Sequence, residues 1–489
     1  MSAEPLTSRE LDGVRERAES FTRDLLQDYY DHYAGLKDSI DIERIYEEYE
    51  DLGRIDLARR LREAPSELWR FGCETYLGNL TRAHQARAAE VEAGLEATVD
   101  GETLPYRMLR VATANEPDRD RRRRLNDERL RLLDEHLSPV YLEAAAIDRD
   151  AVHELDAPNL YELYKGFGFR LDAIADECRE LLDETEKLWE REGDKLFRER
   201  LGISLAEAGQ HDVPRLFRAP ELDEVYPSDR MVPALEATLR DLGIDLRTQQ
   251  NVHLDIEARP NKTPRAFCAP IDVPGKVMLV IQPIGGRDDW QALFHEAGHT
   301  EHYGSMSPDL PFEARRMGDM AVTEGWAQLF EQLVSEPAWL NRRLDVPRVD
   351  LLAHEKAVTL LYIVRRYCAK LLYELEFFQT DDIPSMRPRY SELLSDALKL
   401  PVPGENYLDD IDGGFYVIGY LRSWAFEAQL REFLRGELGN DWFAKRDAGD
   451  LLRELWALGQ APTADELLKD VTGATLELAA VGDRIREGL

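Results

Sequence analysis

Apolar residues recur at every third or fourth position through the first two hundred residues, with charged residues between them. This spacing is typical of amphipathic helices, so positions 7–200 are expected to form a series of them. The pattern is interrupted near Pro65, Gly101–Pro105 and Pro158, where we expect the helices to end. The sequence therefore predicts an N-terminal helical region over residues 1–205.

The pattern changes after position 202, where glycines and prolines become frequent and the helical stretches shorten. Residues 251–283 contain alternating apolar and polar positions and then Lys276–Gln282, a run rich in β-branched residues. This is the only convincing strand region, and helical spacing returns after Asp288. We therefore expect a mainly α fold whose second region, residues 206–489, holds one small β-sheet just before a helix.

The charge balance excludes several classes of partner. Acidic residues number 96 and basic residues 62, which gives a formal net charge of −34. Nucleic acids and anionic membranes would repel such a chain. The basic run Arg121–Arg124 stands among Asp118, Asp120 and Asp127, so we interpret it as a solvated, ion-paired helix face. Because 43% of the residues are apolar, the chain is also not a disordered acidic segment.

The cysteines and the hydropathy pattern bear on location. The four cysteines are about a hundred residues apart and lack the short spacing of a zinc knuckle or a redox motif, so we expect reduced thiols. Residues 1–22 are charged throughout, and no window reaches the roughly 18–20 apolar residues of a membrane span. A cytoplasmic protein without a membrane partner is predicted.

The helix after Asp288 carries the most informative motif, His295-Glu296-Ala297-Gly298-His299. We expect Asp288 to cap this helix at its N-terminus. Residues four apart lie on one face of a helix, so His295 and His299 can offer both imidazoles to one metal ion. Glu296 lies beside them, where its carboxylate can accept a proton from a water on the metal.

A catalytic zinc site needs a third protein ligand. The longer metzincin pattern adds a glycine and a histidine, and it is excluded because those two positions hold His302 and Ser305. The downstream candidates are His302, Glu313, Asp319 and Glu324. His302 lies within one turn of the motif and is poorly placed to complete a tetrahedron. Glu324 begins a strong helical segment that can fold back, so we predict it as the ligand, with Asp319 as the alternative.

Together these residues resemble the thimet oligopeptidase and oligoendopeptidase F family of zinc peptidases, which are gluzincins. The resemblance rests on His-Glu-Ala-Gly-His-Thr-Glu-His at 295–302 and on Glu324, 25 residues after the second ligand. Arg265–Cys268, followed by Val277–Ile281 and Gly285-Gly286, is similar to the family's substrate-edge strand leading into the zinc helix. Phe415–Leu421 is similar to its tyrosine-bearing segment. Gln328 and Glu331 stand where family members often have polar partners. The likeness is strongest over residues 250–335.

The resemblance implies a zincin-like catalytic core in a large two-lobed helical body with a deep substrate cleft. Family members usually have a histidine before the tyrosines that helps to stabilise the transition state. This chain has no histidine after His354, and positions 408–414 read Leu-Asp-Asp-Ile-Asp-Gly-Gly. The resemblance therefore leaves Tyr420 and Tyr416 as the expected donors to the oxyanion.

The expected activity is zinc-dependent hydrolysis of internal peptide bonds in oligopeptides. One Zn²⁺ per chain would be bound by His295, His299 and Glu324, with Glu296 as the base that activates water. The strand Val277–Ile281 is expected to bind the substrate by adding it to a sheet edge.

Acidic residues at the expected cleft, Asp409, Asp410 and Asp412, suggest a preference for basic peptides. Three alternatives stay open. The first is a zinc carboxypeptidase or dipeptidyl carboxypeptidase of the same gluzincin class. The second is an inactive peptide-binding scaffold, and the third is a zinc hydrolase that does not act on peptides. The sequence leaves the oligomeric state open.

Overall fold

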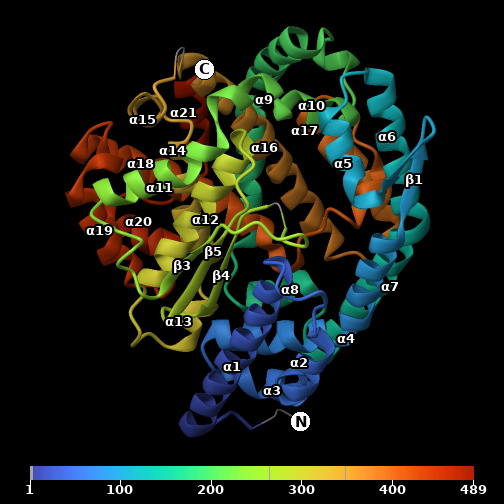
Figure 1. Ribbon diagram of the computed structural model, residues 1–489. Coiled ribbons are helices and arrows are strands. Elements are labelled where there is room, and N and C mark those ends of the chain that lie inside the picture. The colour runs from blue at the N-terminus through green and yellow to red at the C-terminus, as the bar shows by residue number, and fades with distance from the viewer. Residues whose placement is uncertain (1–3, 264, 347–348) are drawn as a thin grey trace.

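The computed structural model describes residues 4–263, 265–346 and 349–489. The described chain is mainly α-helical with two small sheets, so the predicted fold class is confirmed (Figure 1). The division at residue 205 stays a prediction. The largest cluster of buried apolar side chains holds residues from both sides of it, including Trp189 and Trp290.

The first two hundred residues are helical, as their spacing predicts. The helices of this part are α1 (Ser8–Tyr33), α2 (Ile42–Glu48), α3 (Ile55–Arg60), α4 (Ser66–Gly94), α5 (Tyr106–Asn115), α6 (Arg119–Leu132), α7 (Ser138–Val152), α8 (Leu160–Gly166) and α9 (Leu171–Leu201). Helix α1 begins with a capping box in which Thr7 and Glu10 satisfy each other's backbone N–H groups.

The expectation of a single strand region is wrong, because the break near Gly101 is a β-hairpin. Strands β1 (Glu96–Val99) and β2 (Glu102–Pro105) pair in antiparallel register. The two residues between them, Asp100 and Gly101, have φ values of 53° and 85°. An Asp-Gly pair with both φ angles positive forms the type I′ turn that matches the twist of paired strands. The Asp100-Gly101 dipeptide could therefore have predicted this hairpin from the sequence.

The remaining elements follow the change in pattern. They are α10 (Val213–Arg218), α11 (Ser228–Asp241), β3 (Val252–Asp255), β4 (Phe267–Asp272), β5 (Lys276–Val280), α12 (Arg287–Ser305), α13 (Phe312–Arg316), α14 (Met320–Leu333), α15 (Pro337–Arg343), α16 (Val349–Phe377), α17 (Met386–Leu398), α18 (Tyr416–Leu438), α19 (Arg446–Trp456), α20 (Ala464–Thr472) and α21 (Ala479–Gly488).

The order of the three-stranded sheet corrects the predicted substrate strand. Strand β5 lies in the middle, parallel to β3 and antiparallel to β4. The backbone groups of β5 are therefore used on both sides, and Val277–Ile281 offers no free edge. Strand β4 is an outer strand. Helix α1 packs against β4, and α12 packs against both β4 and β5 (Figure 1).

Small residues let three helices approach closely behind the sheet. A Cβ on Gly298 of α12 would stand 2.5 Å from the carbonyl oxygen of Trp326 in α14. A Cβ on Gly325 of α14 would stand 2.4 Å from the ring of Phe426 in α18. Real Cβ atoms do not come this close to other atoms, so glycine is required at both crossings. The glycine of the metal motif thus holds α14 against the face that carries the histidines.

The start of α12 differs from the prediction. The helix begins at Arg287 after Gly286, and Asp288 is an exposed residue of its first turn. The carboxylate of Asp289 accepts hydrogen bonds from the N–H groups of Ile284 (2.7 Å) and Gly285 (2.9 Å) and so holds the preceding loop. Asp288 is therefore not the capping residue.

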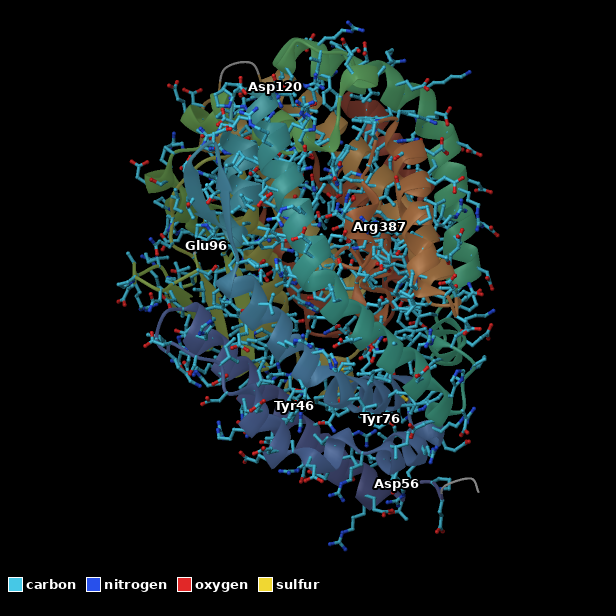
Figure 2. The ribbon with its side chains drawn as sticks, turned by 90° about the vertical axis from the view of Figure 1, so that its right-hand side faces the viewer. Tyr46, Asp56, Tyr76, Glu96, Asp120 and Arg387 are labelled. Carbon is cyan, nitrogen blue, oxygen red and sulfur yellow. The ribbon has the colours of Figure 1, made fainter. Side chains whose placement is uncertain are left out.

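The outer helices carry dense ion pairing. Arg121 pairs with Glu116 at 3.2 Å and Arg124 with Asp100 at 2.7 Å, so the basic run is ion-paired as interpreted. It is not solvated throughout, because Arg122 is buried and pairs with Asp212 at 2.9 Å. Figure 2 views this side of the molecule, with Asp120 of α6 near its top. All four cysteines are free thiols. Of the helices in the described residues, none combines the length and apolar composition that crossing a bilayer requires.

Candidate metal centre

Three predicted ligands lie together between α12 and α14. One ligand atom each from His295, His299 and Glu324 lies within 4.8 Å of the other two. The Oε2 atom of Glu324 is 3.5 Å from Nε2 of His295 and 3.8 Å from Nε2 of His299. Ligands about 2.0–2.1 Å from a tetrahedral zinc ion are about 3.3 Å apart. The arrangement is therefore close to the size of a zinc site.

The outer ring nitrogens of both histidines have hydrogen-bond partners that fix the rings. Nδ1 of His295 lies 3.1 Å from Oε2 of Glu331, and Nδ1 of His299 lies 2.9 Å from the hydroxyl oxygen of Thr323. Lys356 of α16 in turn donates to Glu331 at 3.1 Å. Partners of this kind orient metal-binding histidines. They leave both Nε2 atoms directed at the carboxylate of Glu324.

Glu324 is buried and has one oxygen without a partner. The hydroxyl of Tyr416 donates to its Oε1 at 2.5 Å. Its Oε2 is buried and has no hydrogen-bond partner among the described residues. A buried carboxylate oxygen without a partner carries a large desolvation cost. Since this atom faces the two Nε2 atoms, the residues present fit a metal cation bound among them.

The pKa values show that the cluster stabilises positive charge. Burial opposes protonation of His295, yet the nearby carboxylates of Glu324 and Glu331 raise its pKa to about 10. Burial lowers the pKa of His299 to about 4, so this ring is neutral. The pKa of Glu324 is lowered against the effect of burial by the nearby His299 and His295. The site thus combines an ionised carboxylate with one neutral and one protonated imidazole, and the proton of His295 must leave when a metal binds.

Glu296 lies between the cluster and the outer strand of the sheet. Its Oε2 accepts a hydrogen bond from the N–H of Cys268 in β4 at 2.8 Å. Burial raises the pKa of its carboxyl group. Because the N–H of Cys268 points toward Glu296, this edge of β4 faces the metal cluster.

The two predicted tyrosines differ in their contacts. The hydroxyl of Tyr416 is already engaged by Glu324, so in this structure it supports a predicted ligand. The ring of Tyr420 packs 5.0 Å from that of Tyr416 and 6.3 Å from that of Trp424. Burial raises the pKa of both phenols, so both hydroxyls stay protonated.

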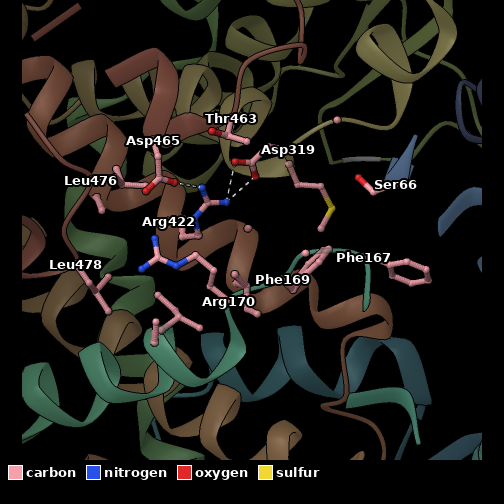
Figure 3. Close-up of a pocket in the computed structure, with 18 of the residues that line it drawn as sticks. Ser66, Phe167, Phe169, Arg170, Asp319, Arg422, Thr463, Asp465, Leu476 and Leu478 are labelled. Atoms are coloured by element: carbon pink, nitrogen blue, oxygen red, sulfur yellow. Dashed lines mark hydrogen bonds and ion pairs between the residues drawn. The ribbon is translucent and has the colours of Figure 1, made fainter. Parts of the chain in front are cut away.

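The other ligand candidates lie in different surroundings. His302 is buried, with Nε2 3.4 Å from the carbonyl oxygen of Gly459. Glu313 binds Arg15 at 2.6 Å. Asp319 caps α14 and forms an ion pair with Arg422 at 2.7 Å. Both residues line a cavity of ≈550 Å³ (Figure 3). Of these candidates, only Glu324 is placed beside both histidines.

Sequence reasoning noted Glu331 as a polar partner but missed Thr323 and Lys356. Glu331 follows Glu324 by seven residues, two turns along the same face of α14, so its position was readable. Thr323 directly precedes the predicted ligand, yet nothing in its residue type marks it. Lys356 comes from α16, and its proximity depends on tertiary packing.

The acidic residues expected to favour basic peptides are neutralised by partners. Asp409 pairs with Arg110 at 2.8 Å. Asp410 pairs with Arg366 at 2.5 Å and accepts from the hydroxyl of Tyr390 at 2.7 Å. Asp412 lies 2.7 Å from the amine of Lys370. These three carboxylates therefore do not offer free negative charge to a ligand.

A cavity of ≈770 Å³ adjoins the cluster. Its lining includes Tyr416, whose hydroxyl touches Glu324, and Arg316, whose guanidinium donates to the carbonyl oxygens of Pro270 and Ile271 on β4. Ligand pockets of about 300–1,000 Å³ hold small molecules or several side chains. Tyr416 and Arg316 thus connect this cavity with the metal cluster and with the outer strand.

The chain was also compared with known proteins. It matches no protein-family model, and no curated protein matches it. The likeness to the oligopeptidase family therefore stays a prediction that rests on the motif residues alone.

Proposed function

We propose that the protein is a zinc-dependent metallopeptidase that hydrolyses internal peptide bonds of oligopeptides. The observation that carries the proposal is the buried, unpartnered Oε2 of Glu324 facing Nε2 of His295 and His299. Two imidazoles and one carboxylate are the protein ligands of many catalytic zinc sites, which leave a fourth position open. Ca²⁺ and Mg²⁺ favour sites built from oxygen ligands, so the two nitrogens support zinc.

A zinc ion held there would supply Lewis-acid polarisation of a carbonyl group and would acidify a bound water. Glu296 would accept the proton of the attacking water. It would pass this proton to the departing amine nitrogen as the C–N bond breaks. Its buried carboxyl group, with a raised pKa, suits a group that must both accept and donate a proton near neutral pH.

The tyrosines would have separate tasks. Tyr416 holds Oε1 of Glu324 and so keeps Oε2 directed at the histidines. Tyr420 would donate a hydrogen bond to the oxygen that becomes negatively charged when water attacks the carbonyl. Of the two expected donors to the oxyanion, only Tyr420 would contact it directly, and Tyr416 would act through Glu324.

The substrate would bind along β4. This strand is the one beside Glu296, and its outer edge carries the N–H of Cys268. Backbone pairing with an extended peptide gives affinity without requiring a particular sequence. Farther along, Arg316 binds the carbonyl oxygens of Pro270 and Ile271, so the free edge is short. A short free edge suits oligopeptides.

One observation favours a second candidate, a zinc carboxypeptidase. Arg70 lines the adjoining cavity, and its Nε is buried without a hydrogen-bond partner among the described residues. A guanidinium group in that state can bind the terminal carboxylate of a peptide. Peptides amidated at the C-terminus separate the two activities, because a carboxypeptidase needs the free carboxylate.

The test uses protein freed of metal with a chelator. A mixture of N-acetylated, C-amidated peptides is incubated with and without one equivalent of Zn²⁺, and products are identified by mass spectrometry. We expect internal cleavage only with zinc. Removal of terminal residues from unblocked peptides alone would favour the carboxypeptidase. Full zinc occupancy without any hydrolysis would favour an inactive peptide-binding scaffold.

A further inference from the structure

One wall of the cavity beside Tyr416 is formed by one face each of α4 and α7. From α4 its lining takes positions 70, 74, 77, 78, 81 and 85, a spacing of three or four that marks a single helix face. From α7 it takes Tyr141, Ala144, Ala145 and Asp148, again one face. Figure 2 views the molecule from the side on which these helices lie.

Asp148 is the unusual member of this lining. Its Oδ1 is buried and has no hydrogen-bond partner among the described residues. Burial raises the pKa of its carboxyl group to about 7, with no neighbouring cation that offsets the effect. An ionised group in this position is stable only when a partner of opposite charge arrives.

Apart from Nε of Arg70, the other charged groups of the cavity have partners among the described residues. Arg149 donates to the carbonyl oxygen of Asp381 at 2.8 Å, and Arg316 binds Glu19 at 2.8 Å. Glu74 accepts from the hydroxyl of Tyr164 at 2.7 Å, and burial raises the pKa of its carboxyl group against the opposing charge of Arg70. Since Asp409 is paired as well, Asp148 is the carboxylate of this lining left for a ligand.

The cavity walls suit a long, flexible ligand with one charged end. Small residues on the two main helices, Gly78, Ala144 and Ala145, leave room in the cavity. Apolar groups such as Leu77 and Phe378 line it too. The methylene stems of lysine and arginine pack on apolar surfaces while their heads seek polar partners.

We propose that this cavity is a side-chain pocket of the peptide-binding site and takes the cationic side chain of a lysine or arginine residue, whose charge is bound by Asp148. The proposal rests on the proposed peptidase function for the identity of the ligand as a peptide. Tyr416 supplies the spatial link, because it lines the cavity and contacts Glu324. The chain's net charge of −34 would also attract cationic peptides.

The test measures binding separately from hydrolysis. The probes are N-acetylated, C-amidated peptides that differ only in having lysine or norleucine at one position. Their affinity for zinc-loaded protein carrying Glu296→Gln is measured by fluorescence anisotropy. Norleucine keeps the methylene chain and removes the charge, and acetylation removes the N-terminal amine as a second source of cation. Asp148→Asn is compared in this background with Asp150→Asn, an equal change at an exposed position of α7 outside the cavity.

We expect the lysine peptide to bind about 10- to 100-fold more tightly than the norleucine peptide, as a hydrogen bond to a charged group allows. Asp148→Asn should abolish this preference, and Asp150→Asn should retain it. Equal binding of the two peptides, or a preference that survives Asp148→Asn, would overturn the proposal. If Asp148→Asn abolishes the preference but the unmodified protein hydrolyses no peptide, the peptidase function would be overturned and the proposal of the pocket would stand.

Discussion

Glu324 and Asp148 each have one buried oxygen without a hydrogen-bond partner among the described residues, but their surroundings differ. Around Glu324, three residues fix the contributing groups: Tyr416 holds its other oxygen, and Glu331 and Thr323 hold the two histidines. Around Asp148 there is open space of ≈770 Å³ and no such support. The site of His295, His299 and Glu324, which we call the rigid site, is preorganised for an ion of fixed geometry. The cavity at Asp148, which we call the open site, has room for a flexible group.

The largest effect expected within the rigid site comes from Glu296→Gln. This change removes the proton acceptor, so turnover should fall at least about 100-fold, the lower range for a general base. Zinc content should stay at one ion per chain, because the three proposed ligands are unchanged. Peptide cleavage and metal analysis on the same sample check both points. Asp288→Asn, on the exposed first turn of α12, is the matched control and should change neither.

Loss of a proposed ligand should act on the metal first. Glu324→Gln should lower zinc affinity by more than the roughly 10- to 100-fold typical of an outer partner. Competition with a chromophoric chelator measures it. Asp319→Asn, at the start of the same helix, serves as the comparison. It should retain zinc while lowering thermal stability, because Asp319 pairs with Arg422. Equal zinc affinity in both variants would refute the assignment of Glu324.

The supporting hydrogen bonds of the rigid site should have intermediate effects. Glu331→Gln removes the charge beside His295 and should weaken zinc binding by about 10- to 100-fold. Thr323→Val removes only a neutral hydroxyl beside His299, so its effect should be smaller. The same chelator competition ranks the two variants. The reverse order would show that the carboxylate does not orient His295.

The open site should show its effect on stability and not on metal binding. The pKa of Asp148 rises from 3.8 to about 7 on folding, so the folded state binds the proton more tightly between these values. Stability of the unmodified protein is therefore lost as pH rises from about 4 to 7, by at most about 4 kcal/mol. Asp148→Asn should escape this loss. Urea unfolding at pH 5 and pH 8 should give it an advantage that is larger at pH 8. An equal difference in stability between the two proteins at pH 5 and pH 8 would show that folding does not raise the pKa of Asp148.

Local patterns predicted much of the rigid site. The spacing of His295 and His299 on one helix face follows from helix geometry, and the segment break before Glu324 allows the chain to return. The strand residues before α12 were also readable. Their order in the sheet was not, because β5 becomes the middle strand only through pairing with both neighbours.

The open site could not be read from the sequence. Asp148 is one of 96 acidic residues, and nothing in its neighbours marks it. Its burial arises because α7 packs against α4, a contact between separate elements. The acidic residues near Tyr416 looked more significant, yet Arg110, Arg366 and Lys370 pair with them. Whether a surface charge is free or paired depends on side chains that are distant in sequence.

The central claim is that His295, His299 and Glu324 bind zinc, and anomalous diffraction tests it most directly. Data from crystals grown with one equivalent of Zn²⁺ are collected on both sides of the zinc absorption edge. The account predicts a single strong peak between Nε2 of the two histidines and Oε2 of Glu324. A peak elsewhere, or no peak at these three atoms at full zinc content, would contradict it.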